Sequence, residues 1–230
     1  MRLNRFYFEF SPIDKKLNIE NDVIVNQIRN VLRMEKGGLI QLFNGRGAEA
    51  LCVIENVDKK KIEVRIDDIF ESRNLSDNRV ILNCSILKKE NFELVVQKAT
   101  EIGVAEITPL ITERTVKLGL NMERLNKIVV EACEQSGRGF LTIINEPITL
   151  DVALEKAQEN DVNLFFNFSK TKLIGKKMSG RIGLFIGPEG GWSEGEVTQA
   201  KKSGCKIVSL GECVLRAETA AIVASYMATV

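Results

Sequence analysis

The hydrophobic positions in the first part of the chain follow the period of short β-strands. Residues 5–10 and 61–66 alternate between apolar and polar side chains, as strands with one buried face do. Two apolar runs, 39–43 and 48–54, flank Asn44-Gly45-Arg46-Gly47. An Asn-Gly pair between apolar runs is typical of a β-hairpin, because both residues tolerate a positive φ. This pattern predicts a small β-barrel-like domain.

One short helix is expected among these strands, with an apolar stripe that faces inward. The stripe consists of Val23, Ile28, Val31 and Leu32. Residues 71–79 are polar and rich in turn formers, which is typical of a linker between domains. We therefore expect one domain over residues 1–72 and a second over residues 73–230.

From Val80 onward, predicted strands and helices alternate. Apolar runs predict strands at 80–87, 107–110, 164–168, 182–186 and 206–210. Helices are predicted over 90–103 and 121–137, from the capping box Ser193–Glu196, and from Glu218 to the end. Such alternation is typical of an α/β domain with a mostly parallel sheet covered by helices.

Two loops that follow predicted strands late in the chain have an unusual composition. The first contains Gly187-Pro188-Glu189-Gly190-Gly191, and the second contains Leu210-Gly211, with Arg216 and Glu218 at the start of the next helix. Ligands of α/β sheets bind at the carboxyl ends of strands, so two such loops after adjacent strands predict one ligand site. The glycines alone also fit an ordinary strand-to-helix turn, and Arg216 and Glu218 also fit a structural ion pair.

The late position of these glycines argues against the common nucleotide-binding folds. In those folds the glycine loop follows the first strand of the unit. Here the loop after Leu87 is Lys88-Lys89-Glu90-Asn91, which has no glycine. The chain also lacks the Gly-Lys-Ser or Gly-Lys-Thr of a phosphate loop. A nicotinamide dehydrogenase, a Rossmann-type methyltransferase and a phosphate-loop enzyme are therefore disfavoured.

Composition narrows the chemistry further. The chain has no histidine, which excludes Ser-His-Asp and Cys-His catalysis and the common histidine-containing zinc sites. A general base must then be a carboxylate, Lys, Tyr or Cys, or belong to the substrate, and we expect no metal. The net charge of +1 does not decide on a nucleic-acid partner, because binding needs only a local basic patch.

The cellular location is also predicted from the sequence. The five cysteines are scattered, and the first residues lack an apolar stretch of secretory length. No window approaches the roughly 20 apolar residues of a membrane span. We therefore expect a cytoplasmic protein with reduced thiols.

Each of two further polar clusters can be interpreted either as an ordinary structural feature or as part of a functional site. Residues 131–138 end in Arg138, beside the predicted C-terminus of a helix, where a basic residue is also a normal helix end. Thr112-Glu113-Arg114-Thr115 fits a solvated loop, although Arg114 is well placed to contact phosphate.

Together these segments closely resemble the SPOUT methyltransferases that make N3-methyluridine in bacterial 16S rRNA. The resemblance rests on Gly187–Ser193 and Leu210–Ala220 and extends to residues 31–34, 42–47, 97–104, 112–115 and 131–138, so it covers nearly the whole chain. The chain departs from the family pattern at three places. Asn26–Asn30 stands where a histidine is common, Trp192 where Phe is usual, and Cys213-Val214 where Arg-Ile is frequent.

The resemblance implies a fold, a cofactor and partners. The C-terminal SPOUT domain would hold a deep trefoil knot, an exception to the usual absence of knots. The N-terminal barrel would be PUA-like and RNA-binding, the cofactor would be S-adenosyl-L-methionine, and the substrate would be 16S rRNA of the small ribosomal subunit. The protein would be a homodimer with its sites at the subunit interface. RNA contacts are expected from Arg5, Arg29, Arg33, Arg46 and Arg114.

The resemblance also implies the residues of the site. Cofactor contacts are expected from Phe166, Asn167, Ile186, Gly187, Gly190, Leu210, Gly211, Val214, Leu215 and Ala220. The uridine N3–H must lose its proton to become nucleophilic, and with no histidine in the chain we expect Glu189 or Glu218 to take it. Arg216 or Arg138 would stabilise the negative charge that develops on O2 or O4 of the uracil.

Two other functions remain compatible with the sequence. One is ribose 2′-O-methylation by the same fold, which mapping of the modified atom would distinguish. The other is a non-catalytic RNA-binding or assembly protein, which would not bind S-adenosyl-L-methionine. The intact glycine loops argue against the second alternative.

Overall fold

The computed structural model describes residues 3–72, 78–116, 119–168, 171 and 178–230. The chain divides into two compact units. The smaller unit comprises Met1–Asn74 and Cys133–Leu141, and the larger comprises Leu75–Ala132 and Thr142–Val230. We did not predict that residues 133–141 group with the N-terminal part. Of the expected linker at 71–79, residues 73–77 lie outside the described residues.

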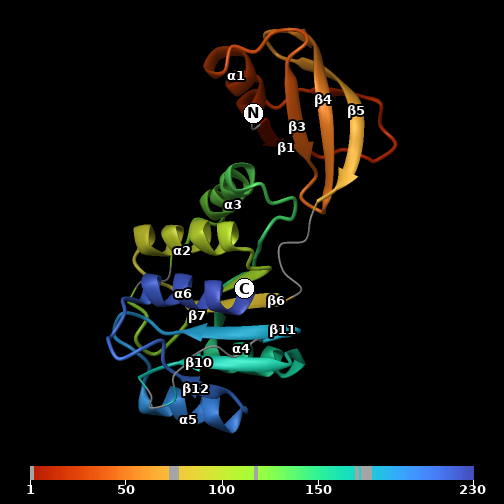
Figure 1. Ribbon diagram of the computed structural model, residues 1–230. Coiled ribbons are helices and arrows are strands. Elements are labelled where there is room, and N and C mark those ends of the chain that lie inside the picture. Colours follow the sequence, from red (N-terminus) through yellow and green to blue (C-terminus); the bar gives the residue numbers. More distant parts are fainter. Residues whose placement is uncertain (1–2, 73–77, 117–118, 169–170, 172–177) are drawn as a thin grey trace. The chain divides into compact units, whose positions relative to one another are not determined.

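The smaller unit is built on a five-stranded sheet (Figure 1). Its strands, in spatial order, are β1 (Asn4–Tyr7), β3 (Leu39–Phe43), β4 (Ala48–Val57), β5 (Ile62–Glu71) and β2 (Lys16–Ile19). β1 pairs with β3 in parallel, and the other pairs are antiparallel. Among the described residues no pairing joins β1 to β2, so hydrogen bonds between these two strands do not close the expected barrel.

The predicted hairpin between β3 and β4 is confirmed. Gly45 and Gly47 have φ angles of +73° and +99°, which only glycine adopts readily. The Asn44 side chain accepts the backbone N–H groups of Arg46 and Ala48, which fixes the turn. The hairpin packs its inner face into the core of the smaller unit, whose fully buried side chains include Ile19, Ile28, Ile40, Leu42 and Ile62.

The predicted stripe of the short helix is wrong at three of its positions. The helix α1 (Asp22–Asn26) continues into a π-helix, η1 (Gln27–Val31). Val23, Val31 and Leu32 are 63%, 66% and 37% exposed, and the buried side chains are Ile24, Val25 and Ile28. At its start the predicted stripe is one residue out of phase, because Ile24 is buried in place of Val23. The wider π turn then rotates residues 31 and 32 away from the core.

A seven-stranded parallel sheet forms the larger unit, which confirms the α/β prediction. Its strands, in spatial order, are β12 (Lys206–Val208), β10 (Val162–Phe166), β11 (Arg181–Ile186), β6 (Arg79–Ser85), β7 (Glu106–Ile111) and β8 (Ile143–Ile144), and β9 (Ile148–Thr149) also pairs with β7. β10 lies between β11 and β12, so the strands before the two glycine loops are not adjacent, contrary to our expectation. The carboxyl end of β10 therefore lies between those loops.

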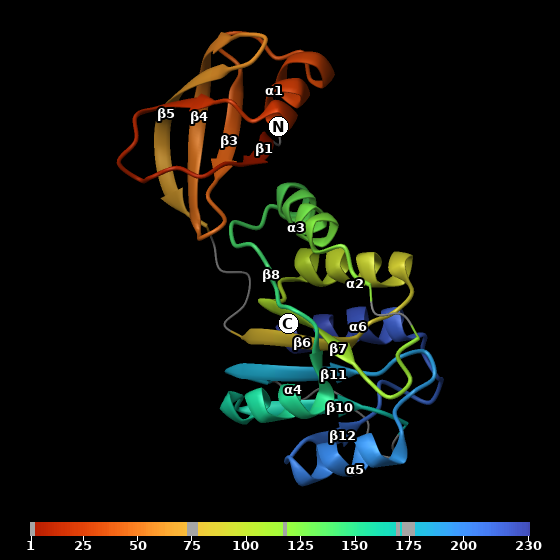
Figure 2. The same cartoon turned by 180° about the vertical axis from the view of Figure 1, so that it is seen from behind.

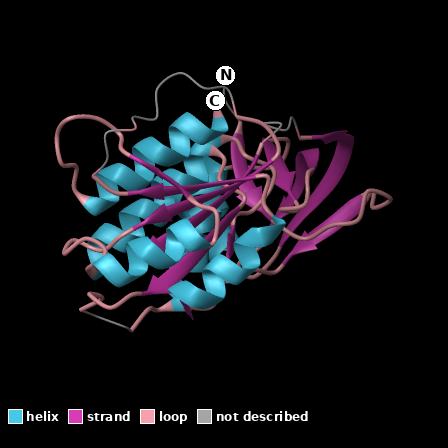
Figure 3. Ribbon diagram, turned by 90° about the horizontal axis from the view of Figure 1, so that it is seen from below, coloured by secondary structure: helices cyan, strands magenta, loops and turns pink. Residues whose placement is uncertain are grey.

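Helices cover both faces of this sheet (Figures 1 and 2). α6 (Ala217–Thr229) packs on β6, β11 and α2 (Lys89–Ile102), whereas α4 (Leu150–Lys156) and α5 (Glu194–Lys202) cover the opposite face. The other helices are α3 (Met122–Ser136) and the 3-10 helix η2 (Ala157–Glu159). Strands dominate the smaller unit, while the larger unit alternates helices and strands (Figure 3). In the part of the chain that the structure describes, no helix has the length and apolar character needed to cross a bilayer.

Residue types near the ends of two helices correctly predicted where those helices end or begin. α2 ends at Gly103, whose φ of +115° is left-handed. α5 begins with the predicted capping box, in which Ser193 and Glu196 each accept a backbone N–H of the other. The elements that the sequence did not predict are all short, namely β2, β8, β9, α4 and η2.

Candidate functional site

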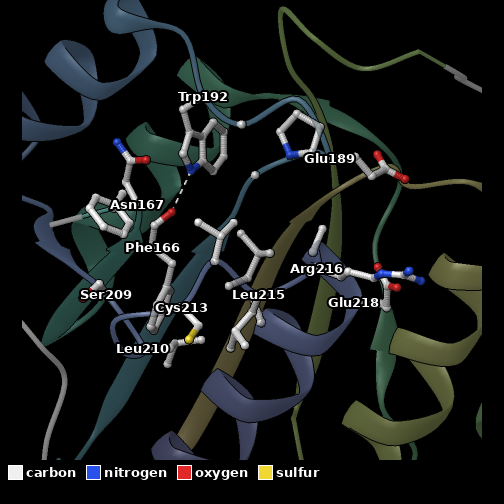
Figure 4. Close-up of a pocket in the computed structure, with 18 of the residues that line it drawn as sticks. Phe166, Asn167, Glu189, Trp192, Ser209, Leu210, Cys213, Leu215, Arg216 and Glu218 are labelled. Carbon is white, nitrogen blue, oxygen red and sulfur yellow. Dashed lines mark hydrogen bonds between the residues drawn. The ribbon is translucent and has the colours of Figure 1, made fainter.

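A cavity of about 730 Å³ lies in the larger unit, where β10, β11 and β12 end (Figure 4). Its walls are the carboxyl ends of these strands, the loops after β11 and β12, and the first turns of α6 and α2. They comprise residues 166–168, 186–189, 191–192, 208–211, 213–218 and 220, with Lys88 and Asn91. The cavity is therefore at the edge where ligands of α/β sheets bind.

The cavity brings together most of the residues predicted from the sequence. Every expected cofactor contact except Gly190 lines it, as do the expected catalytic residues Glu189, Arg216 and Glu218. Sequence reasoning missed Lys88 and Asn91. Both belong to the segment from β6 into α2, at the same edge of the sheet. We used that loop only as evidence against a nucleotide-binding fold, because it lacks glycine. Its position after a buried strand could have indicated that it lines the ligand site.

Trp192 fixes the wall between β10 and β11. Its indole Nε1–H donates to the carbonyl oxygen of Phe166 at 3.0 Å, and its ring lies 4.3 Å from the Phe165 ring, centroid to centroid (Figure 4). Gly187 packs directly under the indole, where a Cβ would come within 2.9 Å of Trp192. The first glycine of the loop is therefore required by packing on Trp192.

Substituting Gly187→Ala is expected to displace Trp192 and to lower the free energy of unfolding by about 1–3 kcal/mol, the usual cost of overpacking. Trp192 is the only tryptophan, so its emission should shift to the red as the ring becomes solvated. Urea unfolding measures the first effect and fluorescence the second. Gly211→Ala is the control, because a Cβ there meets nothing within 4 Å. Equal stability and emission for the two variants would contradict the packing role of Gly187.

The two carboxylates of the site differ in their surroundings. Glu189 is exposed, and its Oε1 accepts the backbone N–H of Lys88 at 3.4 Å. Glu218 is only 8% exposed, and it has no hydrogen bond or ion pair among the described residues. Glu218 also lines the cavity, where its carboxylate can meet a ligand. Glu218 is therefore the carboxylate that is free to act on a ligand.

Cys84, at the end of β6, is excluded as the nucleophile of this site. Burial raises the pKa of its thiol strongly, and the negative charges of Glu189 and Glu218 raise it further. The thiol is therefore protonated at neutral pH, and the thiolate is the nucleophilic form of cysteine. The same interaction shows that both carboxylates lie near the end of β6.

Arg216 is a basic residue that lines the cavity on the side of the carboxylates. It is exposed, and it is the N-cap residue of α6, which begins at Ala217. Figure 4 shows Glu189, Arg216 and Glu218 on one side of the cavity and Asn167, Ser209 and Leu210 on the other. The cavity thus has a charged side and a less polar side.

Arg138 is not part of this cavity. It is 7% exposed, groups with the smaller unit, and has a pKa lowered by burial. Within one chain Arg138 does not line the cavity, because residues 133–141 group with the smaller unit, and its role as the alternative to Arg216 stays a prediction.

Arg5 is also placed differently from our expectation. Its side chain is 4% exposed and forms an ion pair with Glu49 at 2.9 Å. It also donates to the carbonyl oxygens of Cys133 and Arg138 and lies over the Phe43 ring. Arg5 therefore joins residues 133–141 to the sheet of the smaller unit and is not available to contact RNA.

The other arginines of the expected RNA contacts are exposed. Arg29 and Arg33 have no ion pair among the described residues, and Arg46 pairs with Glu9 at 3.2 Å on the surface. Arg33 has a φ of +50°, the only positive φ of a non-glycine residue in the described part of the chain. Arg114 is exposed as well, and its Nη1 donates to the Gly190 carbonyl oxygen at 2.7 Å.

The described residues hold no group of three or more Cys, Asp or Glu placed to bind a metal ion.

Comparison with known proteins places this site in a family. A family model described as an RNA methyltransferase domain matches residues 74–228, and one described as an RNA methyltransferase PUA domain matches residues 26–67. The ribosomal RNA small subunit methyltransferase E of Rickettsia conorii is 32% identical over 97% of this chain and 94% of its own length.

Two solved structures share the whole architecture. The ribosomal RNA small subunit methyltransferase E of Neisseria gonorrhoeae, bound to S-adenosyl methionine, has a TM-score of 0.90 at 32% identity, covering 97% of this chain and 95% of its own. A Legionella pneumophila protein in complex with the bound cofactor SAM has a TM-score of 0.88 at 36% identity, covering 98% and 96%. The chain therefore belongs to the ribosomal RNA small subunit methyltransferase E family, with an RNA methyltransferase domain and a PUA domain.

Proposed function

We propose that this protein transfers the methyl group of S-adenosyl-L-methionine to N3 of a uridine in 16S rRNA of the small ribosomal subunit. The names of its relatives support the rRNA of the small subunit, and the ligands of the Neisseria and Legionella structures support the cofactor. The observation that carries the proposal is the cavity that the glycine loops form around Glu218, which is 8% exposed and has no hydrogen bond or ion pair within the described ranges.

The residues of the cavity fit S-adenosyl-L-methionine. Phe166, Ile186 and Leu210 offer an apolar surface for the adenine ring. The carboxylates of Glu189 and Glu218 favour a ligand with positive charge, which this cofactor carries on its sulfonium. A Cβ at Gly211 would meet nothing within 4 Å, so the backbone there is open to a ligand. When bound, the cofactor supplies an electrophilic methyl group for in-line displacement.

The chain itself supplies proton transfer and charge stabilisation. Glu218 accepts the N3 proton of the uridine as the general base of the site. Arg216 stabilises the negative charge that moves onto O2 or O4 as the proton leaves. Glu189 belongs to the turn that lines the cavity and is held by the N–H of Lys88.

RNA binding in the smaller unit rests on Arg29, Arg33 and Arg46. Arg29 and Arg33 are exposed without ion pairs among the described residues, so phosphate contacts would not break an existing bond. The exposed side chains of Val31 and Leu32 flank them. Recognition of unpaired RNA commonly combines phosphate contacts with apolar surface for bases.

Substituting both Arg29→Gln and Arg33→Gln is expected to weaken RNA binding and to reduce its salt dependence. Each lost phosphate contact lowers the slope of log K against log salt by about one unit or slightly less. The measurement is a fluorescence anisotropy titration at several salt concentrations. Lys16→Gln is the control, because its ammonium already pairs with Glu55 at 2.8 Å. An unchanged slope in the double variant would exclude these arginines from the RNA interface.

The remaining parts of the proposal concern assembly and location. We propose a homodimer in the cytoplasm, whose larger unit contains a trefoil knot. The exposed apolar side chains at the C-terminal end of α6 support a subunit contact there, with Tyr226 57% and Val230 79% exposed. Analytical ultracentrifugation measures the assembly, and a monomer at all concentrations would contradict the dimer.

Calorimetric titration and a methyl-transfer assay test the function together. We expect the purified protein to bind S-adenosyl-L-methionine and to transfer its labelled methyl group to small-subunit RNA. Absence of cofactor binding would contradict the proposal and favour a non-catalytic RNA-binding protein.

A further inference from the structure

The loop after β11 makes a tight turn at Pro188–Gly191. Hydrogen bonds from other segments of the chain hold its two exposed residues. The Gly191 N–H donates to the Pro188 carbonyl oxygen at 2.9 Å, and Gly191 has a φ of +70°. Between them lie Glu189 and Gly190, both exposed. Because Pro188, Glu189 and Gly191 line the cavity, the conformation of this turn determines the shape of the wall.

The two bonds that hold the turn from outside are of unequal strength. The Lys88 N–H reaches Glu189 Oε1 at 3.4 Å, which is long for a hydrogen bond. Arg114 Nη1 donates to the Gly190 carbonyl oxygen at 2.7 Å. This second bond is short and charge-assisted, and such bonds are the stronger class. Arg114 is therefore the main external support of the turn.

Arg114 extends from a loop that is itself well fixed. The Glu113 N–H donates to Glu196 Oε1 at 3.0 Å, and Glu196 is the buried capping-box residue of α5. Thr112 and Thr115 join their hydroxyl groups at 2.8 Å, and the Thr115 hydroxyl also contacts that of the buried Ser85 at 3.2 Å. These bonds hold the backbone from which Arg114 extends in one position relative to α5 and β6.

We propose that Arg114 is a positioning residue that holds the Pro188–Gly191 turn in the conformation that binds the cofactor. This inference rests on the proposed function for the identity of the ligand. Without the Arg114 bond the turn samples more conformations, and the cofactor must order it on binding. The role differs from the phosphate contact expected from the sequence, because it predicts an effect on cofactor affinity in the absence of RNA.

The test compares Arg114→Gln and Arg114→Lys with the control Arg124→Gln. Arg124 is an exposed arginine of the same unit that pairs with Glu93 at 3.5 Å and does not line the cavity. Calorimetric titration without RNA should show about tenfold weaker binding of S-adenosyl-L-methionine by Arg114→Gln, as expected for loss of one charge-assisted hydrogen bond. Arg114→Lys should recover part of this loss, and Arg124→Gln should bind like the wild type.

A second measurement needs no ligand. Trp192 follows the turn directly and is the only tryptophan, so acrylamide quenching of its emission reports on the mobility of the turn. We expect stronger quenching in Arg114→Gln than in Arg124→Gln. Equal quenching and equal cofactor affinity in these two variants would overturn the proposal. A reduced salt slope of RNA binding with unchanged cofactor affinity would also overturn it, in favour of a phosphate contact.

The same experiments would give a different result if the proposed function itself were wrong. In that case the wild type itself would not bind S-adenosyl-L-methionine. The quenching comparison would then still decide whether Arg114 holds the turn.

Discussion

Substituting Glu218→Gln is expected to lower the turnover number for methyl transfer to RNA by about 10²- to 10⁴-fold, the range in which general acid–base catalysis contributes. The amide keeps the size of the side chain but cannot accept the N3 proton. Glu218 has no hydrogen-bond partner among the described residues, so the substitution breaks no bond there. Thermal stability should therefore stay close to that of the wild type.

The matched comparison is Glu189→Gln. Glu189 is exposed, and from the described part of the chain its carboxylate accepts only the Lys88 N–H, which an amide oxygen can also accept. We expect a much smaller loss of turnover in this variant. Single-turnover kinetics at saturating cofactor separates the chemical step from binding. If Glu189→Gln lost more turnover than Glu218→Gln, the assignment of the proton acceptor to Glu218 would be wrong.

The largest effect on stability is expected for Arg5→Met. Loss of one partner from a buried ion pair costs about 3–5 kcal/mol, because the remaining charge is left uncompensated. Here Glu49 would stay buried, and of the residues that the structure describes only Gln41 and Ser72 would still donate to its carboxylate. The donation from Arg5 to the carbonyl oxygens of Cys133 and Arg138 would also be lost. Urea unfolding followed by circular dichroism measures the change.

Two further variants test this explanation. Lys16→Met removes one partner of the pair between Lys16 and Glu55, which is exposed, and such pairs contribute about 0–1 kcal/mol. Combining Arg5→Met with Glu49→Leu removes both buried charges and should recover part of the lost stability. If Arg5→Met were no more destabilising than Lys16→Met, the buried pair would not be what fixes residues 133–141.

The features that the sequence predicted correctly depend on neighbouring residues. The hairpin at Asn44–Gly47 and the capping box at Ser193 each arise within four or five positions of the chain, so their residue types reveal them. The glycine loops were likewise recognisable because each follows an apolar strand. We predicted their grouping into one site on the assumption that the two strands are adjacent. β10 separates them, but both loops still line one cavity because the three strands are parallel and end at the same edge of the sheet.

The features that the sequence did not predict depend on distant residues. Arg5 is buried because Glu49 lies 44 positions away and Cys133 lies 128 positions away, and no local pattern contains this information. The position of β10 between β11 and β12 is likewise set by strand pairing across the chain. The helix stripe at Val31 and Leu32 was wrong because a π turn does not follow the helical period that we assumed.

The most direct test of the proposed function is to identify the methylated atom. Small-subunit RNA that lacks the modification is incubated with the purified protein and S-adenosyl-L-methionine, digested to nucleosides, and analysed by mass spectrometry against synthetic standards. The proposal predicts one new nucleoside, N3-methyluridine, whose formation is strongly reduced with the Glu218→Gln variant. A 2′-O-methylated nucleoside, or no methylated product at all, would contradict it.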